Sequence, residues 1–251
     1  MWNGDYGFLL HNLISKDFKV RYRNMSLGMF WSLLNPLVTM GVLTVVFTTF
    51  MPRSDIKDYP LFFLCGLIPY NFFAMAWSTG TSSLAENAHL IKRVAVPREV
   101  IPIATVLGNS LHLLIQVALL LVFALIEGHV NRYWAWLPLI WALEVVLLCG
   151  LALISSAVNV YVRDTRYLVE SFNAVLFWLV PIVYPFPPPQ YQRLFELNPV
   201  AALVFAIRDI LLDGKPPAGS LLTKLSVGSV AVLVLGLVLF RRMKQGFYDY
   251  L

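Results

Sequence analysis

Charged residues and cysteines are both scarce in this sequence. Asp, Glu, Lys and Arg make up 13% of the 251 residues and hydrophobic residues 59%, whereas a soluble domain typically carries roughly 25% charged residues. The core of a protein of this length cannot hold so many apolar side chains. Part of the protein surface must therefore be apolar, which indicates that lipid surrounds it. The two cysteines, Cys65 and Cys149, lie in apolar runs. They favour packing roles and indicate neither a disulfide framework nor a metal site.

Sequence motifs for nucleotide binding and hydrolysis are also absent. No G-x-x-x-x-G-K-[ST] loop occurs, so the chain should not hydrolyse ATP itself. H-E-x-x-H and G-x-S-x-G are missing, and no Ser-His-Asp set can be placed together. Residues 1–24 lack the short apolar segment and small-residue cleavage site of a secretory signal. We therefore predict a chain that is not an enzyme and holds no catalytic residue, metal or cofactor.

Long runs without charge locate the membrane helices, because crossing a hydrocarbon core of about 30 Å takes roughly 20 apolar residues. Six runs qualify; the fourth contains one charge, Glu144, and the sixth is short unless Lys224 extends outward to the interface. The predicted spans are about 28–50, 61–84, 101–126, 136–160, 166–184 and 222–240. The expected fold is an all-α membrane protein, one transmembrane domain over residues 1–251.

An outer region, residues 185–221, separates spans five and six. A cluster of prolines ends span five, at Pro185, Pro187, Pro188 and Pro189. The apolar stretch Leu197–Ile207 follows, and its length of about 16 Å as a helix is too short to cross the membrane. It is predicted to be a re-entrant or interfacial helix.

Basic residues set the orientation. Four precede span one, namely Lys16, Lys19, Arg21 and Arg23, and three follow the last span, namely Arg241, Arg242 and Lys244. An even number of spans places both clusters on one side, and the positive-inside rule assigns that side to the cytosol. Both termini, including the tail 241–251, are predicted to be cytosolic. The net charge of +5 is accounted for in this way, so no nucleic-acid partner is indicated.

The N-terminal segment 1–26 is predicted to form a basic amphipathic helix at the interface. Its apolar positions recur every three to four residues, at Leu9, Leu10, Leu13, Ile14, Phe18 and Tyr22. Its charged residues include Asp17, Lys19, Arg21 and Arg23. Such a helix is either a plain membrane anchor or a sliding surface that transmits the movement of a partner to the spans.

The segment between spans two and three is the clearest candidate for a docking site. Leu90, Ile91 and Val94 can form the apolar edge of a short helix that Pro97 limits. Lys92, Arg93 and Arg98 add positive charge beside that edge. Such a helix can dock into a groove on a soluble protein, while the alternative is an ordinary positive-inside loop. The residues by themselves leave both interpretations open.

Polar residues within the spans form a second group. Thr105, Asn109, His112 and Gln116 share one helical face, which either bonds to packed helices or faces a hydrated substrate path. Glu144 costs on the order of 2.5–3.5 kcal/mol in mid-membrane, so it is neutral, paired with a group such as His112, or lines a cavity. Aromatic residues of the spans can also stack against sugar rings. The candidate channel-lining residues are Asn109, His112, Gln116, Glu144 and Phe177.

Several stretches together resemble the type-2 ABC exporter permeases that move lipid-linked polysaccharides such as O-antigen, capsule or teichoic acid. Residues 17–37 are similar to the family's R-Y-x-x-S-x-L-G-x-x-W-x-x-L-x-P signature, except that Ser26 directly precedes the leucine. Four further similar stretches follow in the family's order, at 90–98, 159–165, 197–200 with 208–209, and 240–251. The resemblance therefore covers essentially the whole chain.

The resemblance implies a homodimer in the bacterial cytoplasmic membrane, with a channel between the copies for a lipid-linked glycan. Two copies of a separate ATPase, which bind ATP and Mg²⁺, would dock beneath. The implied coupling residues are Leu90, Ile91, Lys92, Arg93, Val94, Pro97 and Arg98, with the helix around 17–23 beside them. The alternatives are an ABC-2 exporter of small hydrophobic compounds and, less favoured by the few intramembrane charges and the missing inverted repeat, an ion-coupled secondary transporter.

Overall fold

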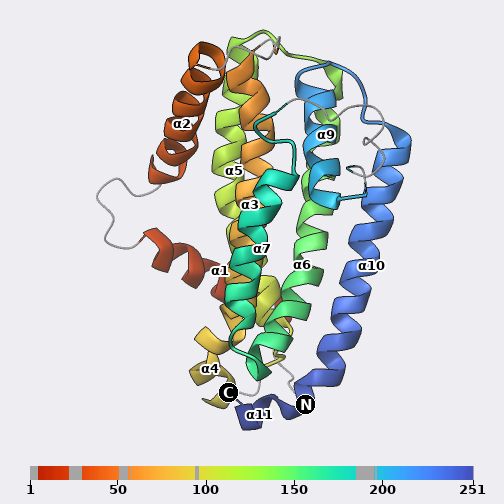
Figure 1. Ribbon diagram of the computed structural model, residues 1–251. Helices are drawn as coiled ribbons and strands as arrows, with labels where there is room; N and C mark the ends of the chain where they lie inside the picture. Colours follow the sequence, from red (N-terminus) through yellow and green to blue (C-terminus); the bar gives the residue numbers. More distant parts are fainter. Residues whose placement is uncertain are drawn as a thin grey trace.

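The computed structural model describes residues 5–22, 30–50, 56, 58–93, 96–184, 195 and 197–250. Apart from the connections between helices, these residues are helical and contain no strand, which confirms the expected all-α class. The long helices lie side by side in one bundle (Figure 1). Their bounds are α1 Tyr6–Tyr22, α2 Phe30–Val45, the π-helix η1 Val46–Phe50, α3 Tyr59–Glu86, α4 Ala88–Arg93, α5 Val100–Ile126, the 3₁₀ helix η2 Arg132–Trp136, α6 Leu137–Tyr161, α7 Thr165–Leu179, α9 Pro199–Leu211, α10 Gly219–Met243, the 3₁₀ helix η3 Lys244–Gly246 and α11 Phe247–Tyr250.

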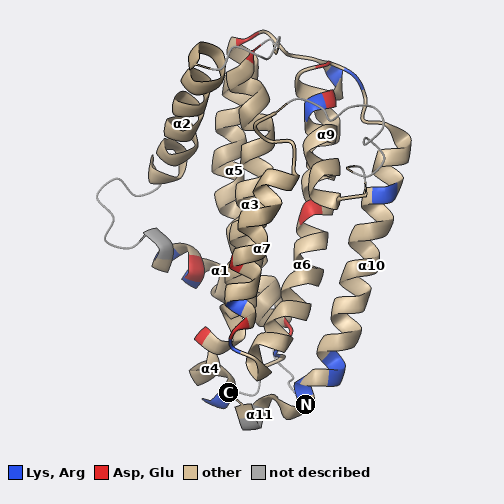
Figure 2. Ribbon diagram, viewed as in Figure 1, with Lys and Arg blue, Asp and Glu red and all other residues tan. Residues whose placement is uncertain are grey.

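Among the described residues, five helices are long and apolar enough to cross a membrane. They are Phe30–Phe50, Tyr59–Arg93, Val100–Ile126, Arg132–Tyr161 and Gly219–Gly246. Charged residues gather toward the two ends of the bundle and leave the middle of most helices free of charge (Figure 2). The protein is therefore a multi-pass membrane protein.

The expected fifth span, 166–184, is shorter as a helix than its apolar run. Helix α7 has 15 residues and ends at Leu179, which corresponds to a length of about 22 Å. Val180 is extended (φ −90°, ψ 133°) because it precedes Pro181, and proline disfavours helical backbone in the residue before it. The helix thus stops before the proline cluster at 185–189, which lies outside the described residues.

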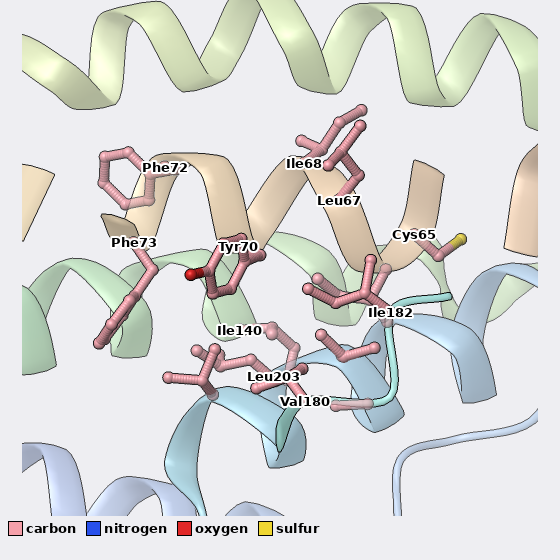
Figure 3. Close-up of a cluster of buried hydrophobic side chains, with 14 of the residues drawn as sticks. Cys65, Leu67, Ile68, Tyr70, Phe72, Phe73, Ile140, Val180, Ile182 and Leu203 are labelled. Carbon is pink, nitrogen blue, oxygen red and sulfur yellow. The ribbon is translucent and has the colours of Figure 1, made fainter. Parts of the chain in front are cut away.

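Helix α3 forms the centre of the bundle and packs against α5, α6, α7 and α9. Its side chains Leu67, Ile68 and Phe72 are buried. Figure 3 shows this core, in which residues of α3 meet Ile140 of α6, Leu203 of α9 and the segment after α7. The interior is as apolar as the surrounding lipid, so close packing rather than hydrophobic exclusion must hold these helices together.

The close contact between α6 and α10 depends on two glycines. A Cβ built on Gly236 would lie 2.6 Å from the carbonyl oxygen of Gly150, and one built on Gly150 would lie 2.6 Å from the Leu233 nitrogen. Any larger residue would have to push the two backbones apart. Small residues permit this approach, which is a common way for membrane helices to associate.

Helix α9 lies inside the bundle, beside α3, α6 and α10. All its residues from Val200 to Leu211 are buried, including Arg208, which is 3% exposed. The guanidinium of Arg208 donates to the carbonyl oxygens of Pro181 (2.6 Å), Ile182 (3.0 Å) and Phe62 (3.2 Å), and its carbon lies 3.5 Å from the centre of the Phe62 ring. The arginine therefore bonds backbone acceptors of the non-helical segment after α7, which lipid could not satisfy.

Candidate functional site

The short helix α4 stands at the lower end of the bundle, directly after α3 (Figure 1). Ile91 is 7% exposed and faces the protein, whereas Lys92 and Arg93 are exposed, and Leu90 is half-buried. Ile91 belongs to a group that we call the basal cluster: Leu13, Leu84, Ile91, Val100, Ile101, Ala104, Leu153, Ala157, Val160, Phe240 and Phe247. The helix is thus anchored by one apolar residue and presents a basic edge to its surroundings.

The turn between α3 and α4 is organised by Asn87, which the sequence reasoning overlooked. Its side-chain nitrogen donates to the Ser83 carbonyl (2.8 Å), and its own carbonyl accepts from the backbone N–H groups of Leu90 and Ile91. Lys16 of α1 donates to the side-chain oxygen of Asn87 (2.8 Å). A charge-assisted bond of this kind is stronger than a neutral one, so α1 is tied directly to the start of α4.

Arg98 behaves differently from the other predicted coupling residues. It is half-buried, its Nη1 donates to the carbonyl oxygen of Lys244 (2.7 Å), and its guanidinium lies 6.0 Å from the centre of the Phe247 ring. Pro97 is also half-buried. Val94 lies outside the described residues. The predicted coupling segment therefore divides into an exposed edge on α4 and an arginine that contacts the C-terminal end of the same chain.

Helix α1 packs against α5. Asp17 is half-buried and Lys19 exposed, while the side chain of Arg21 and the whole of Arg23 lie outside the described residues. A pocket of about 250 Å³ lies between α1, α3 and α5, and its lining includes Asp17, Glu86 and Asn109. One residue predicted for the interface helix and one predicted for the channel thus share a polar pocket.

The polar residues on one face of α5 form hydrogen bonds with two different neighbouring helices. The side-chain nitrogen of Asn109 donates to the Thr79 hydroxyl of α3 (2.9 Å). Nearer the other end, Gln116 donates to the Ser32 carbonyl of α2 (3.3 Å) and lies 3.4 Å from His112 Nε2. Asn109 and Gln116 are buried and His112 is half-buried. In this single chain the contacts of Asn109 and Gln116 fit hydrogen bonding between packed helices.

The two remaining channel candidates have different surroundings. Glu144 is completely buried in α6, and neither carboxyl oxygen finds a hydrogen-bond partner within the described part of the chain. Of the three alternatives considered for this residue, a hydrogen-bonded pair with His112 is therefore not formed in the single chain. Phe177 of α7 is half-buried and meets Tyr70 edge-on, with 5.3 Å between ring centres. The Tyr70 hydroxyl in turn donates to the Asn173 carbonyl, which joins α3 to α7.

Comparison with known proteins connects these features to a family. The family model described as ABC-2 type transporter matches the sequence over residues 9–212. This stretch includes α3, α4, α5, α6, α7 and α9. This chain belongs to the ABC-2 type transporter family. The family predicted from the sequence motifs is therefore confirmed.

Named relatives of this ABC-2 chain align along nearly its whole length. An O-antigen export system permease protein RfbA of Klebsiella pneumoniae is 30% identical over 97% of the chain and 95% of the relative. The RfbA protein of Myxococcus xanthus is 28% identical over the same shares. The polysialic acid transport protein KpsM of Escherichia coli is 27% identical over 93% of the chain and 92% of the relative.

Proposed function

We propose that this chain is the membrane subunit of an exporter that moves a lipid-linked polysaccharide, of the O-antigen kind, across the bacterial cytoplasmic membrane. The observation that carries the proposal is the alignment with O-antigen and polysialic acid exporters over more than nine-tenths of the chain. The sequence has no phosphate-binding loop of its own. In the proposed complex ATP and Mg²⁺ are bound by a separate ATPase subunit.

The ATPase would dock on the exposed edge of α4. Lys92 and Arg93 point away from the protein while Ile91 holds the helix to the basal cluster. A short helix with a basic edge suits an acidic groove on a soluble partner. Closure of the ATPase pair on ATP would move α4, and the bond between Lys16 and Asn87 would pass that movement to α1.

A six-span arrangement with both ends in the cytosol is part of the proposal. Helix α7 with the segment Val180–Tyr184 would be the fifth span, and α9 would be the re-entrant element of the outer region. Its support is physical: Arg208 bonds the carbonyl groups of Pro181 and Ile182, and irregular backbone is tolerated at membrane depth only when protein satisfies it. α1 would lie along the cytosolic interface. Accessibility tags on the two termini test this, and tags found on opposite sides would contradict it.

A second copy of the chain would complete the channel. Helix α2 contacts the bundle along little of its surface, since Ser32 and Pro36 are its only buried residues. Trp31 and Val38 on α2, and Leu168, Phe172 and Trp178 on α7, are large apolar side chains that remain exposed in the single chain. Packing of these faces against a second copy would bring the residues predicted to line the channel near a shared path.

Purification of the chain with the proposed partner ATPase, followed by reconstitution in lipid, tests the proposed function. We expect ATP hydrolysis that rises on addition of the lipid-linked glycan and transfer of that glycan across the bilayer. Stimulation by small hydrophobic compounds but not by the glycan would contradict the proposal.

A further inference from the structure

The end of the chain folds back under the bundle instead of extending away from it. After α10, the helices η3 and α11 bring Phe247 into the basal cluster, where its side chain is fully buried. Its ring meets Phe240 of α10 edge-on (5.4 Å between centres) and Tyr161 of α6 (5.9 Å). A Cβ at Gly246 would lie 2.6 Å from the Tyr161 hydroxyl, so a larger residue here would have to displace the end of that side chain.

Three polar contacts attach the same turn to two other parts of the chain. Arg98 donates to the Lys244 carbonyl (2.7 Å), and the Tyr161 hydroxyl donates to the Met243 carbonyl (2.7 Å). The Lys244 ammonium lies 3.7 Å from Glu99. The last carbonyl groups of a helix have no partner within that helix. Here the donors come from the segment before α5 and from the end of α6.

Through these contacts the tail connects the segment before α5 with the ends of α6 and α10. Arg98 and Glu99 lie between the docking helix α4 and α5, Tyr161 ends α6, and Met243 and Lys244 end α10. Ile91 of α4 and Phe247 of α11 are members of the same basal cluster. A displacement of α4 therefore has a packed and hydrogen-bonded route to α5, α6 and α10 at once.

We propose that residues 243–247, held by Arg98 and Tyr161, form a brace that transmits movement of α4 to the spans, and that Arg98 is a positioning residue of this brace and not part of the ATPase docking surface. The proposal rests on the proposed function, because it takes α4 as the place where the ATPase acts. It assigns different roles to two arginines only a few positions apart. Arg93 is exposed and would contact the partner, whereas Arg98 bonds the chain's own tail.

The test compares Arg98→Met with Arg93→Met in the reconstituted complex. Methionine keeps much of the apolar stem of arginine and removes the charge and all donors. For R98M we expect the ATPase to co-purify within about twofold of wild type, and glycan exported per ATP hydrolysed to fall by about tenfold, the usual scale of one charge-assisted hydrogen bond. For R93M we expect loss of co-purification instead.

Two further variants distinguish loss of the brace from general damage to the fold as the cause of reduced coupling. Arg98→Lys keeps a cation that can donate a hydrogen bond to the Lys244 carbonyl, so it should recover part of the export per ATP. Tyr161→Phe keeps the rings in contact and loses only the bond to Met243, so it should lower coupling less than R98M does. Hydrogen exchange of the 243–250 amides should accelerate in R98M, and this readout does not depend on the substrate.

Three results would overturn the brace. They are a loss of ATPase from R98M as large as that from R93M, unchanged export per ATP in R98M, and unchanged exchange of the tail amides. If the glycan neither stimulates ATP hydrolysis by the wild-type complex nor is exported by it, the proposed function is refuted instead. The hydrogen-exchange and co-purification measurements would still decide whether Arg98 holds the tail.

Discussion

Replacement of Arg208 by methionine probes how a broken helix is tolerated inside the membrane. The variant removes the donors to three carbonyl oxygens, those of Phe62, Pro181 and Ile182, while keeping an unbranched apolar side chain. Proline and the extended residue before it leave the segment after α7 without helical bonds of its own. The Pro181 and Ile182 carbonyl groups would then lose their donor in the non-helical segment, whereas the Phe62 carbonyl lies within helix α3.

The magnitude follows from these three bonds. Hydrogen bonds between membrane helices average about 0.6 kcal/mol, which gives about 2 kcal/mol as the lower limit. A buried acceptor left unsatisfied costs roughly 1–3 kcal/mol, and part of that loss is offset because a buried cation no longer has to be desolvated, so about 5 kcal/mol is the upper limit. We expect Arg208→Met to lower the free energy of unfolding by about 2–5 kcal/mol.

The assay is denaturant or thermal unfolding of the purified chain in detergent, with Arg132→Met as the matched control. Arg132 lies in η2, is exposed, and donates to the neighbouring Tyr133 hydroxyl; its loss should leave the transition unchanged. Arg208→Lys is the decisive comparison, since lysine keeps the charge but cannot reach separate carbonyl groups as the planar guanidinium does. It should destabilise at least as much as methionine. A stable lysine variant beside an unstable methionine variant would refute the reasoning, because charge and not donor geometry would then matter.

Three other substitutions test the remaining assignments. Gly236→Ala places a Cβ 2.6 Å from the Gly150 carbonyl and should cost about 1–3 kcal/mol in the same unfolding assay; Gly228→Ala in the same helix meets nothing within 4 Å and should cost nothing, and equal effects would contradict the close contact. Arg93→Glu reverses the basic edge of α4 and should lower ATPase co-purification at least about tenfold, as like-charge contacts cost several kcal/mol; unchanged co-purification would remove α4 as the docking site. Glu144→Gln keeps the side-chain volume, so stability should change by less than about 1 kcal/mol, while reduced export would assign the carboxyl to the path and normal export would assign it to packing.

Part of the candidate site could be predicted from residue patterns. The exposed edge of α4 follows from basic residues beside a short apolar stretch that a proline ends, and Lys92 and Arg93 are exposed as that pattern suggests. The same pattern grouped Arg98 with them, although its guanidinium bonds the carbonyl of Lys244. No spacing rule could relate the two residues, since the contact joins parts of the chain 146 positions apart.

The sequence pattern also could not predict which neighbouring helix each polar residue of α5 contacts. Helical periodicity places Asn109 and Gln116 on one face. Their partners, Thr79 of α3 and Ser32 of α2, depend on how the neighbouring helices are placed around α5. The early end of α7 was within reach of sequence reasoning, because Pro181 is a local signal. The predicted span was instead ended at the proline cluster, so α7 ends at Leu179, five residues before the end of the span predicted over 166–184.

The sequence by itself determined that this is an all-helical membrane protein, because the scarcity of charge and the length of the apolar runs depend only on the solvent that surrounds each helix. The order of its motifs carried the resemblance to the ABC-2 family. Only the tertiary structure decided which polar groups meet: Arg208 on the broken segment, Lys16 on Asn87, and Arg98 on the tail. In lipid every backbone group must find a partner within the protein. Which partner it finds is a property of helix packing, and packing brings together residues that the order of the chain keeps apart.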